Sequence, residues 1–149
     1  MLWPISIVVA ATLTLKGHKR RAAALLLVTV GGRLIVELLK WATDRPRPQL
    51  FDYPMIVHSQ SFPSGHASNS MIVYLAAALI AAPLLTRGRW PATAAIVLAI
   101  AIGFTRPMLG VHWPSDVLAG WALGLAWTLS TVWLLTRWME ERPVAGRSD

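Results

Sequence analysis

The sequence contains no cysteine, and only 14% of its 149 residues are charged. Without cysteine, disulfide scaffolds, thiol nucleophiles and Cys-ligated zinc or iron–sulfur sites are excluded. Soluble domains carry roughly 25% charged residues, so this shortage of charge, together with 55% hydrophobic residues, excludes a soluble globular protein. The formal net charge of +7 then fits orientation in a membrane, and we do not expect nucleic-acid binding.

The apolar residues fall into five stretches. Three of these are 20 residues long, enough to cross a hydrocarbon core of roughly 30 Å at about 1.5 Å per residue. The other two are 14 and 15 residues long. The stretches are Leu2–Leu15, Ala22–Trp41, Ala67–Thr86, Pro91–Thr105 and Val117–Thr136. We therefore predict an all-α, polytopic transmembrane bundle of about five spans, forming one membrane-embedded domain over residues 1–149 with a short cytoplasmic tail at 138–149.

The basic residues predict the orientation of these spans. Nine of the 14 lie in the turns Lys16–Arg21 and Arg87–Arg89 and near the C-terminus, at Arg137, Arg142 and Arg147. Five crossings place these three regions on one face, which the positive-inside rule makes cytoplasmic. The opposite face has four basic residues: Lys40, Arg45, Arg47 and Arg106. The remaining one, Arg33, lies within a span. The sequence therefore predicts an outside N-terminus and a multi-pass protein of the cell or inner membrane.

The same topology brings three polar segments to the non-cytoplasmic face. Lys40, Arg47 and Arg106 supply three cations there, and guanidinium groups form planar forks suited to phosphate oxygens. Ser64 and Gly65 immediately precede an apolar span, so they should form a helix N-terminus, where N–H groups and the helix dipole favour anions. These residues predict a site for phosphate or a similar oxyanion.

Two histidines beside this site indicate catalysis rather than storage. His112 and Asp116 are four residues apart at the start of the last span, so the carboxylate is placed to accept from one imidazole nitrogen and leave the other free for attack. Phosphoryl transfer needs a nucleophile, stabilisation of the phosphoryl charge and help for the leaving oxygen. We assign the first role to His112 and the last to His66. Only Asp44, Asp52 and Asp116 supply carboxylates on this face, which does not favour a two-metal mechanism.

These segments resemble the three motifs of the type 2 phosphatidic acid phosphatase (PAP2) family of membrane lipid phosphatases. The segments in order are Lys40-x6-Arg47-Pro48, Pro63-Ser64-Gly65-His66 and Arg106-x5-His112-x3-Asp116. The resemblance covers the chain from about Arg33 to Trp138 with every spacing intact. Three motifs in this order within a polytopic chain are highly specific.

The resemblance implies a role for each matching residue. His112 attacks phosphorus to form a phosphohistidine, Asp116 orients His112, and His66 protonates the leaving group. The phosphate is held by five residues, and no metal or other cofactor is needed. The phosphate-binding residues are Lys40, Arg47, Ser64, Gly65 and Arg106.

Two features depart from the family pattern. The third motif usually opens Ser-Arg, whereas this chain has Thr105-Arg106; both residues carry a hydroxyl. Members commonly have six spans, and counting back from the motifs, the first is the one missing here. We expect this to affect stability and substrate entry rather than the motifs. Asp44, Arg45 and Asp52 lie outside the matching positions, and we expect them at the surface.

The sequence thus predicts a membrane phosphatase with an extracytoplasmic site that hydrolyses a polyprenyl diphosphate, phosphatidylglycerol phosphate or phosphatidate. It does not rank these lipids, separate hydrolysis from transfer to another lipid, or fix the oligomeric state. Two other classes remain as alternatives. One is a vanadium-dependent haloperoxidase, whose vanadate pocket is similar but whose members are soluble. The other is an inactive lipid-phosphate binder, which would need the cations but neither the histidines nor Asp116.

Overall fold

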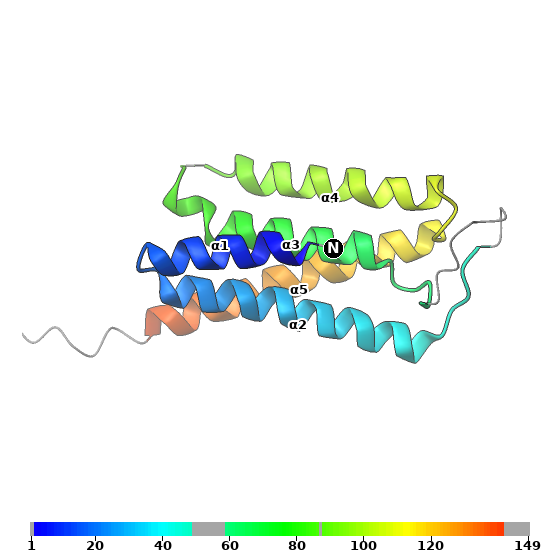
Figure 1. The fold of residues 1–149 in the computed structure, drawn as a ribbon, viewed down its shortest axis with the longest axis horizontal. Helices are drawn as coiled ribbons and strands as arrows, with labels where there is room; N and C mark the ends of the chain where they lie inside the picture. Colours follow the sequence, from blue (N-terminus) through cyan, green and yellow to red (C-terminus); the bar gives the residue numbers. More distant parts are fainter. Residues whose placement is uncertain (1, 49–58, 87, 142–149) are drawn as a thin grey trace, which may run out of the picture.

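A computed structural model describes residues 2–48, 59–86 and 88–141 of the chain. Within these ranges the secondary structure is entirely helical, and the helices lie along one another as a bundle (Figure 1). The elements in chain order are α1 (Trp3–Leu15), α2 (Lys19–Thr43), α3 (Gly65–Ile80), the 3-10 turn η1 (Ala82–Leu84), α4 (Trp90–Met108) and α5 (Pro114–Glu141).

Local sequence explains where these helices start and stop. Pro4 and Pro91 lie in the first turns of α1 and α4, and Pro114 opens α5; proline suits this position because its fixed φ is helical and its missing N–H would have no partner there. Helix α3 starts after Ser64, whose side chain accepts from the N–H of Ala67. The starts of α3, α4 and α5 are therefore defined by their local sequence.

Four of the helices are long and apolar enough to cross a membrane: α2, α3 with η1, α4 and α5. The short fourth apolar stretch of the sequence becomes the 19-residue α4, because the helix continues past Thr105 to Met108. Helix α1 has 13 residues, about 20 Å of rise, and is shorter than these spans. Helix α5 reaches Glu141, so the predicted tail at 138–149 starts within a helix, and its residues 142–149 lie outside the described ranges.

Helix α3 lies at the centre of the bundle, in contact with all four other α-helices. Helix α5 packs against it through glycines. A Cβ atom at Gly124 would lie 2.8 Å from the Cβ of Met71, and one at Gly120 would lie 2.9 Å from the carbonyl oxygen of Ser64. The small residues therefore let α5 approach the backbone of α3 closely, and this contact fixes the start of α5 beside the start of α3.

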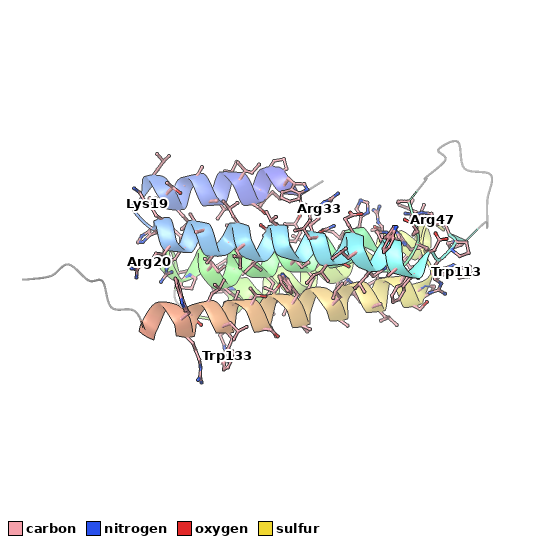
Figure 2. All side chains as sticks on the ribbon, turned by 90° about the horizontal axis from the view of Figure 1, so that it is seen from below. Lys19, Arg20, Arg33, Arg47, Trp113 and Trp133 are labelled. Carbon is pink, nitrogen blue, oxygen red and sulfur yellow. The ribbon has the colours of Figure 1, made fainter. Side chains whose placement is uncertain are left out.

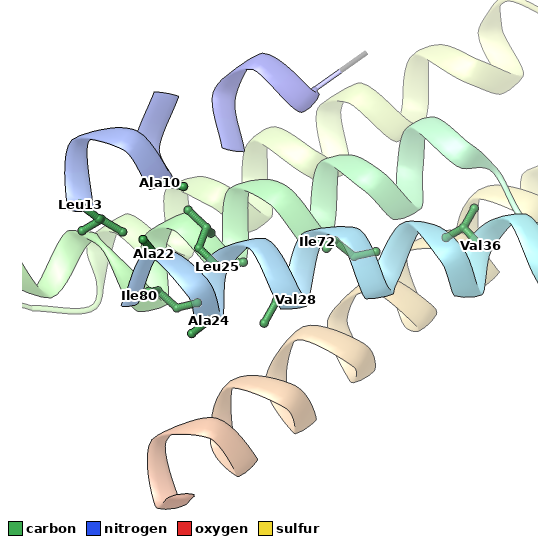
Figure 3. Close-up of a cluster of buried hydrophobic side chains, with 10 residues drawn as sticks. Ala10, Leu13, Ala22, Ala24, Leu25, Val28, Val36, Ile72 and Ile80 are labelled. Carbon is green, nitrogen blue, oxygen red and sulfur yellow. The ribbon is translucent and has the colours of Figure 1, made fainter. Parts of the chain in front are cut away.

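The largest apolar core lies among α1, α2 and α3 (Figure 3). Leu25 and Val28 of α2 are completely buried there, beside Ile72 of α3. Trp127 of α5 covers the same core and donates from its indole Nε1 to the carbonyl oxygen of Val28, 2.8 Å away. This core keeps α2 and α3 in register, so that their site-bearing ends meet.

The two ends of the bundle differ in chemistry. The α1–α2 turn, the α3–α4 connection and the end of α5 lie at one end, and the loops that carry the motifs lie at the other (Figure 1). Lys19 and Arg20 mark the first end, whereas Arg47 and Trp113 mark the second (Figure 2). The gathering of the three motifs at one end is thus confirmed, and the assignment of that end to the extracytoplasmic side stays a prediction.

Candidate active site

A cavity of about 440 Å³ opens at the motif-bearing end of the bundle. Six of the eight predicted site residues line it: Lys40, Arg47, Gly65, His66, Arg106 and His112. The other two, Ser64 and Asp116, are completely buried, and a hydrogen bond joins them to each other. The backbone N–H of Ser64 donates to the carbonyl oxygen of Asp116 at 2.9 Å, which ties the start of α3 to the start of α5.

His112 lies in the loop between α4 and α5, with only 4% of its surface exposed. Its Nδ1 is 3.5 Å from Oδ2 of Asp116, and its Nε2 is 3.2 Å from Nη1 of Arg47. Because a guanidinium only donates hydrogen bonds, Nε2 is the accepting nitrogen and the imidazole proton resides on Nδ1. The geometry therefore leaves a lone pair on Nε2 at the cavity and directs the Nδ1 proton toward the carboxylate.

Arg47 holds two loops together beside this imidazole. Its Nη1 donates to the carbonyl oxygen of Val111 at 2.7 Å, while Nε and Nη2 donate to the carbonyl oxygen and hydroxyl of Ser59, each at 2.9 Å. The side chain is thus fixed from two directions. A rigid guanidinium beside Nε2 can bind an oxyanion at the point where the imidazole would attack it.

Lys40 and the start of α3 form another wall of the cavity. Lys40 is 6% exposed, and its Nζ donates to the carbonyl oxygen of Gln60 at 2.7 Å. Its Cε would lie 3.5 Å from a Cβ atom at Gly65, so the lysine passes directly over the first residue of α3. This arrangement combines a cation with the positive end of a helix dipole, as an anion site requires.

His66 and Arg106 complete the lining. His66 projects from the first turn of α3 and is exposed. Arg106 lies in the last turn of α4, where its Nε and Nη2 donate to Oγ1 of Thr105 at 2.9 and 2.7 Å. The hydroxyl of Thr105 therefore lies against the Arg106 guanidinium. Arg106 lines the cavity and is not buried, so its guanidinium is accessible to a ligand.

Two partners of Asp116 were not predicted from the sequence. Nη1 of Arg45 donates to Oδ1 of Asp116 at 2.7 Å, and the hydroxyl of Ser61 donates to Oδ2. The expectation that Arg45 has only a surface role is therefore wrong, because its guanidinium is paired with a fully buried carboxylate. Asp44 is exposed, as expected, whereas Asp52 lies outside the described residues. Arg45 is 71 positions from Asp116, a separation that no local pattern reveals.

The surroundings of His112 determine its protonation. Burial, followed by the positive charges of Arg47 and Lys40, lowers the pKa of His112 from 6.5 to about 4, against the opposing influence of Asp116. The imidazole is consequently neutral at pH 7, which is the form that has a lone pair to donate. A perturbed histidine in a cavity of cations is typical of a functional site.

The cavity also extends along α2 away from the motifs. Arg33 and Glu37 line this part, and they form a 3.2 Å ion pair that is half exposed. Apolar residues of α1 and α3 line it as well. Arg33 is seven residues from Lys40, about 10 Å along the helix. Within the described ranges, no three His, Cys, Asp or Glu side chains gather closely enough to hold a metal ion. The cavity thus continues from the cationic site along α2, where polar and apolar residues both line it.

Comparison with known proteins identifies relatives over most of this chain. A family model of the PAP2 superfamily matches residues 21–140. Phosphatidylglycerophosphatase B of Bacillus subtilis is 35% identical over 130 residues, which are 83% of this chain and 63% of that protein. Lipid A 1-phosphatase of Rhizobium johnstonii is 40% identical over 124 residues, or 77% of this chain and 48% of the relative.

An archaeal protein and a solved structure extend these similarities. Undecaprenyl-diphosphatase of Sulfolobus acidocaldarius is 33% identical over 122 residues, which cover 78% of this chain and 56% of that protein. The crystal structure of a transmembrane PAP2 type phosphatidylglycerolphosphate phosphatase from Bacillus subtilis superposes with a TM-score of 0.77 at 29% identity, covering 97% of this chain and 72% of the other. The chain spans about half to two thirds of the length of these curated relatives.

Proposed function

The chain belongs to the PAP2 superfamily, and we propose on that premise that it hydrolyses a lipid phosphate or diphosphate through a phosphohistidine at His112, without a metal. One observation carries this proposal. The neutral imidazole of His112 presents Nε2 to a cavity lined by Lys40, Arg47 and Arg106, while its Nδ1 faces the buried carboxylate of Asp116. A nucleophile, its orienting group and a phosphate-binding surface thus meet at one point.

The first step forms the phosphoenzyme. The phosphoryl oxygens bind to Arg47, Lys40 and Arg106. Nη1 of Arg47 then donates its hydrogen bond to a substrate oxygen instead of to Nε2 of His112. The lone pair on Nε2 then attacks phosphorus as the bond from phosphorus to the leaving oxygen breaks. His66 donates a proton to that oxygen, so the lipid alcohol or lipid monophosphate leaves with this oxygen protonated.

The second step releases phosphate. His66, now deprotonated, accepts a proton from a water molecule as the water oxygen attacks phosphorus and the bond from phosphorus to Nε2 breaks. The phosphorylated imidazole carries a positive charge and a proton on Nδ1, and Asp116, 3.5 Å away, stabilises that charge. The three cations neutralise the equatorial oxygens in both steps, which is the role that metal ions fill in other phosphatases.

The cavity and the relatives support a lipid substrate. The cationic end of the cavity and its extension along α2 provide room for a molecule with a phosphate at one end and a longer body behind it. The relatives named above are a lipid A 1-phosphatase, a phosphatidylglycerophosphatase and an undecaprenyl-diphosphatase. We propose a substrate of this lipid phosphate class, reached from the extracytoplasmic leaflet because the basic turns lie at the opposite end of the bundle.

The pH dependence of the reaction should report the state of His112. Because the pKa of His112 is lowered to about 4, the free enzyme keeps its nucleophile neutral at every pH above that value. We therefore expect kcat/KM to stay level on the acid side from pH 7 to about pH 5 and to fall only as the pH approaches 4. Initial rates measured in buffers of constant ionic strength check this. An acid limb near pH 6.5, the value of an ordinary imidazole, would contradict the assigned environment.

The proposed function is tested by phosphate release from purified protein in detergent micelles. The substrates are phosphatidate, phosphatidylglycerol phosphate and undecaprenyl diphosphate, each assayed with and without excess EDTA. We expect release from at least one lipid at a rate that EDTA does not change. Release that stops in EDTA and returns with a divalent cation would refute the metal-independent route, and folded protein that releases phosphate from none of these lipids would refute the phosphatase assignment.

A further inference from the structure

The carboxylate of Asp116 makes its shortest contacts with groups other than His112. Oδ1 accepts from Nη1 of Arg45 at 2.7 Å, and Oδ2 accepts from the hydroxyl of Ser61 and, at 2.9 Å, from the N–H of Trp113. The Nδ1 of His112 is 3.5 Å away, at the outer limit of a hydrogen bond. The position of Asp116 is therefore set chiefly by these other donors.

Arg45 is built into this position from several sides. Its Nη1 also donates to Oγ of Ser115 at 2.9 Å, and its guanidinium lies 5.8 Å from the centroid of the Trp113 ring. The indole Nε1 of Trp113 in turn donates to the carbonyl oxygen of Pro46 at 3.2 Å. The segment after α2 is thus attached to the start of α5 through the same arginine that pairs with Asp116.

Ser61 links the arginine, the carboxylate and the imidazole. Its backbone N–H donates to the carbonyl oxygen of Arg45 at 2.8 Å, its hydroxyl donates to Asp116, and its Oγ lies 3.5 Å from Nδ1 of His112. Ser61 is completely buried, so these contacts are shielded from bulk solvent. Arg45, Ser61 and Asp116 therefore form a closed set of contacts behind the imidazole.

We propose that Arg45 and Ser61 are positioning residues of this active site, which hold the buried Asp116 carboxylate in place and aimed at Nδ1 of His112. The physical reason is the cost of burying a charge: a carboxylate with no exposed surface keeps its position only when a cation and hydrogen-bond donors face it. Arg45 is the cation within hydrogen-bond distance of Asp116. A displaced Asp116 would no longer stabilise the phosphorylated imidazole.

The proposal rests on the proposed function, and it also predicts a change that does not depend on turnover. The charged groups around His112 are Lys40 and Arg47, from α2 and the segment after it, and Asp116 from α5. Arg45 acts on His112 through Asp116. Without Arg45 the carboxylate is no longer aimed at Nδ1, so the influence of Asp116 that raises the pKa of His112 is weakened. The pKa of His112 should therefore fall further when Arg45 is replaced by methionine.

The kinetic test compares Arg45→Met, Arg45→Lys and Ser61→Ala with Arg89→Met, an exposed arginine at the opposite end of the bundle. We expect Arg45→Met to lower kcat on the order of 10- to 100-fold with KM unchanged, and to move the acid limb to lower pH. Arg45→Lys keeps the cation and should restore most of kcat, Ser61→Ala should lower kcat by a smaller factor, and Arg89→Met should match the wild type. Wild-type kcat and acid limb in Arg45→Met would overturn the proposal.

Histidine-selective ¹³C NMR in micelles provides the second readout, with His112→Gln used to assign the His112 resonance. A lower His112 pKa in Arg45→Met than in the wild type and Arg89→Met supports the proposal even if no lipid tested is hydrolysed, an outcome that would count against the proposed function alone. An unchanged or raised His112 pKa in folded Arg45→Met overturns the proposal. A loss of kcat that Arg45→Lys does not restore, without a change in the pH profile, also overturns it, because it would show a purely structural role.

Discussion

Replacing His112 with alanine should lower phosphate release by at least about 10³-fold, because it removes the group that forms the bond to phosphorus. The cations of the cavity stay in place, so the variant should still bind lipid phosphate and the loss should fall on kcat rather than on KM. His112→Gln should show the same loss while keeping a polar side chain at this buried position. A binder that merely stores lipid phosphate would show no such pattern.

Steady-state kinetics of His112→Ala, His112→Gln and the wild type measure this effect. His18→Ala is the matched control, since His18 lies exposed in the turn between α1 and α2 at the other end of the bundle, and it should retain wild-type kcat. Thermal unfolding in the same micelles checks that each variant is folded. Turnover by folded His112→Ala within about tenfold of the wild type would show that another group attacks phosphorus.

The second large effect is expected from Arg47→Lys, although the substitution preserves the charge. Arg47 contacts Nε2 of His112 and three atoms of the two neighbouring loops at the same time. A lysine ammonium has neither the planar fork nor the reach to make these contacts together. We expect kcat/KM to fall about 100-fold, the usual consequence of removing one preorganised donor to a developing oxyanion.

The loss in Arg47→Lys should appear in both kcat and KM, because Arg47 binds the phosphate in the ground state and in the transition state. Arg20→Lys, an exposed arginine at the far end of the bundle (Figure 2), is the matched control and should have wild-type kinetics. Inorganic phosphate, as a competitive inhibitor, should also bind more weakly to Arg47→Lys. An unchanged inhibition constant together with unchanged kcat/KM would remove Arg47 from the phosphate site.

Much of the fold could be predicted from the sequence because the signals are local. Apolar stretches and their flanking basic turns indicate the spans and bring three distant motifs to one end, which the structure confirms. The apolar pattern of the sequence underestimates the length of α4. The apolar stretch ends before Arg106 and Pro107, whereas both residues lie in the last turn of the helix. A charged residue or a proline near a helix end is compatible with continued helical geometry.

The site could be predicted where the topology of the spans and the spacing within the motifs carry the information. His112 and Asp116 are four residues apart, and their contact follows from that separation. The contact between Arg45 and Asp116 joins residues 71 positions apart, and the contact between Ser61 and Asp116 joins residues 55 apart. These contacts depend on how the segment after α2 folds over the start of α5, a tertiary relation that composition and periodicity do not encode.

The central claim is the covalent intermediate on His112, and it is tested most directly by trapping. Purified protein is mixed with a ³²P-labelled lipid phosphate that it hydrolyses, quenched within milliseconds in alkali and digested for mass spectrometry. We predict label on the peptide that contains His112, stable in alkali and lost in acid, and absent from His112→Gln. Rapid release of phosphate without any labelled protein, or label on a different residue, would contradict this mechanism.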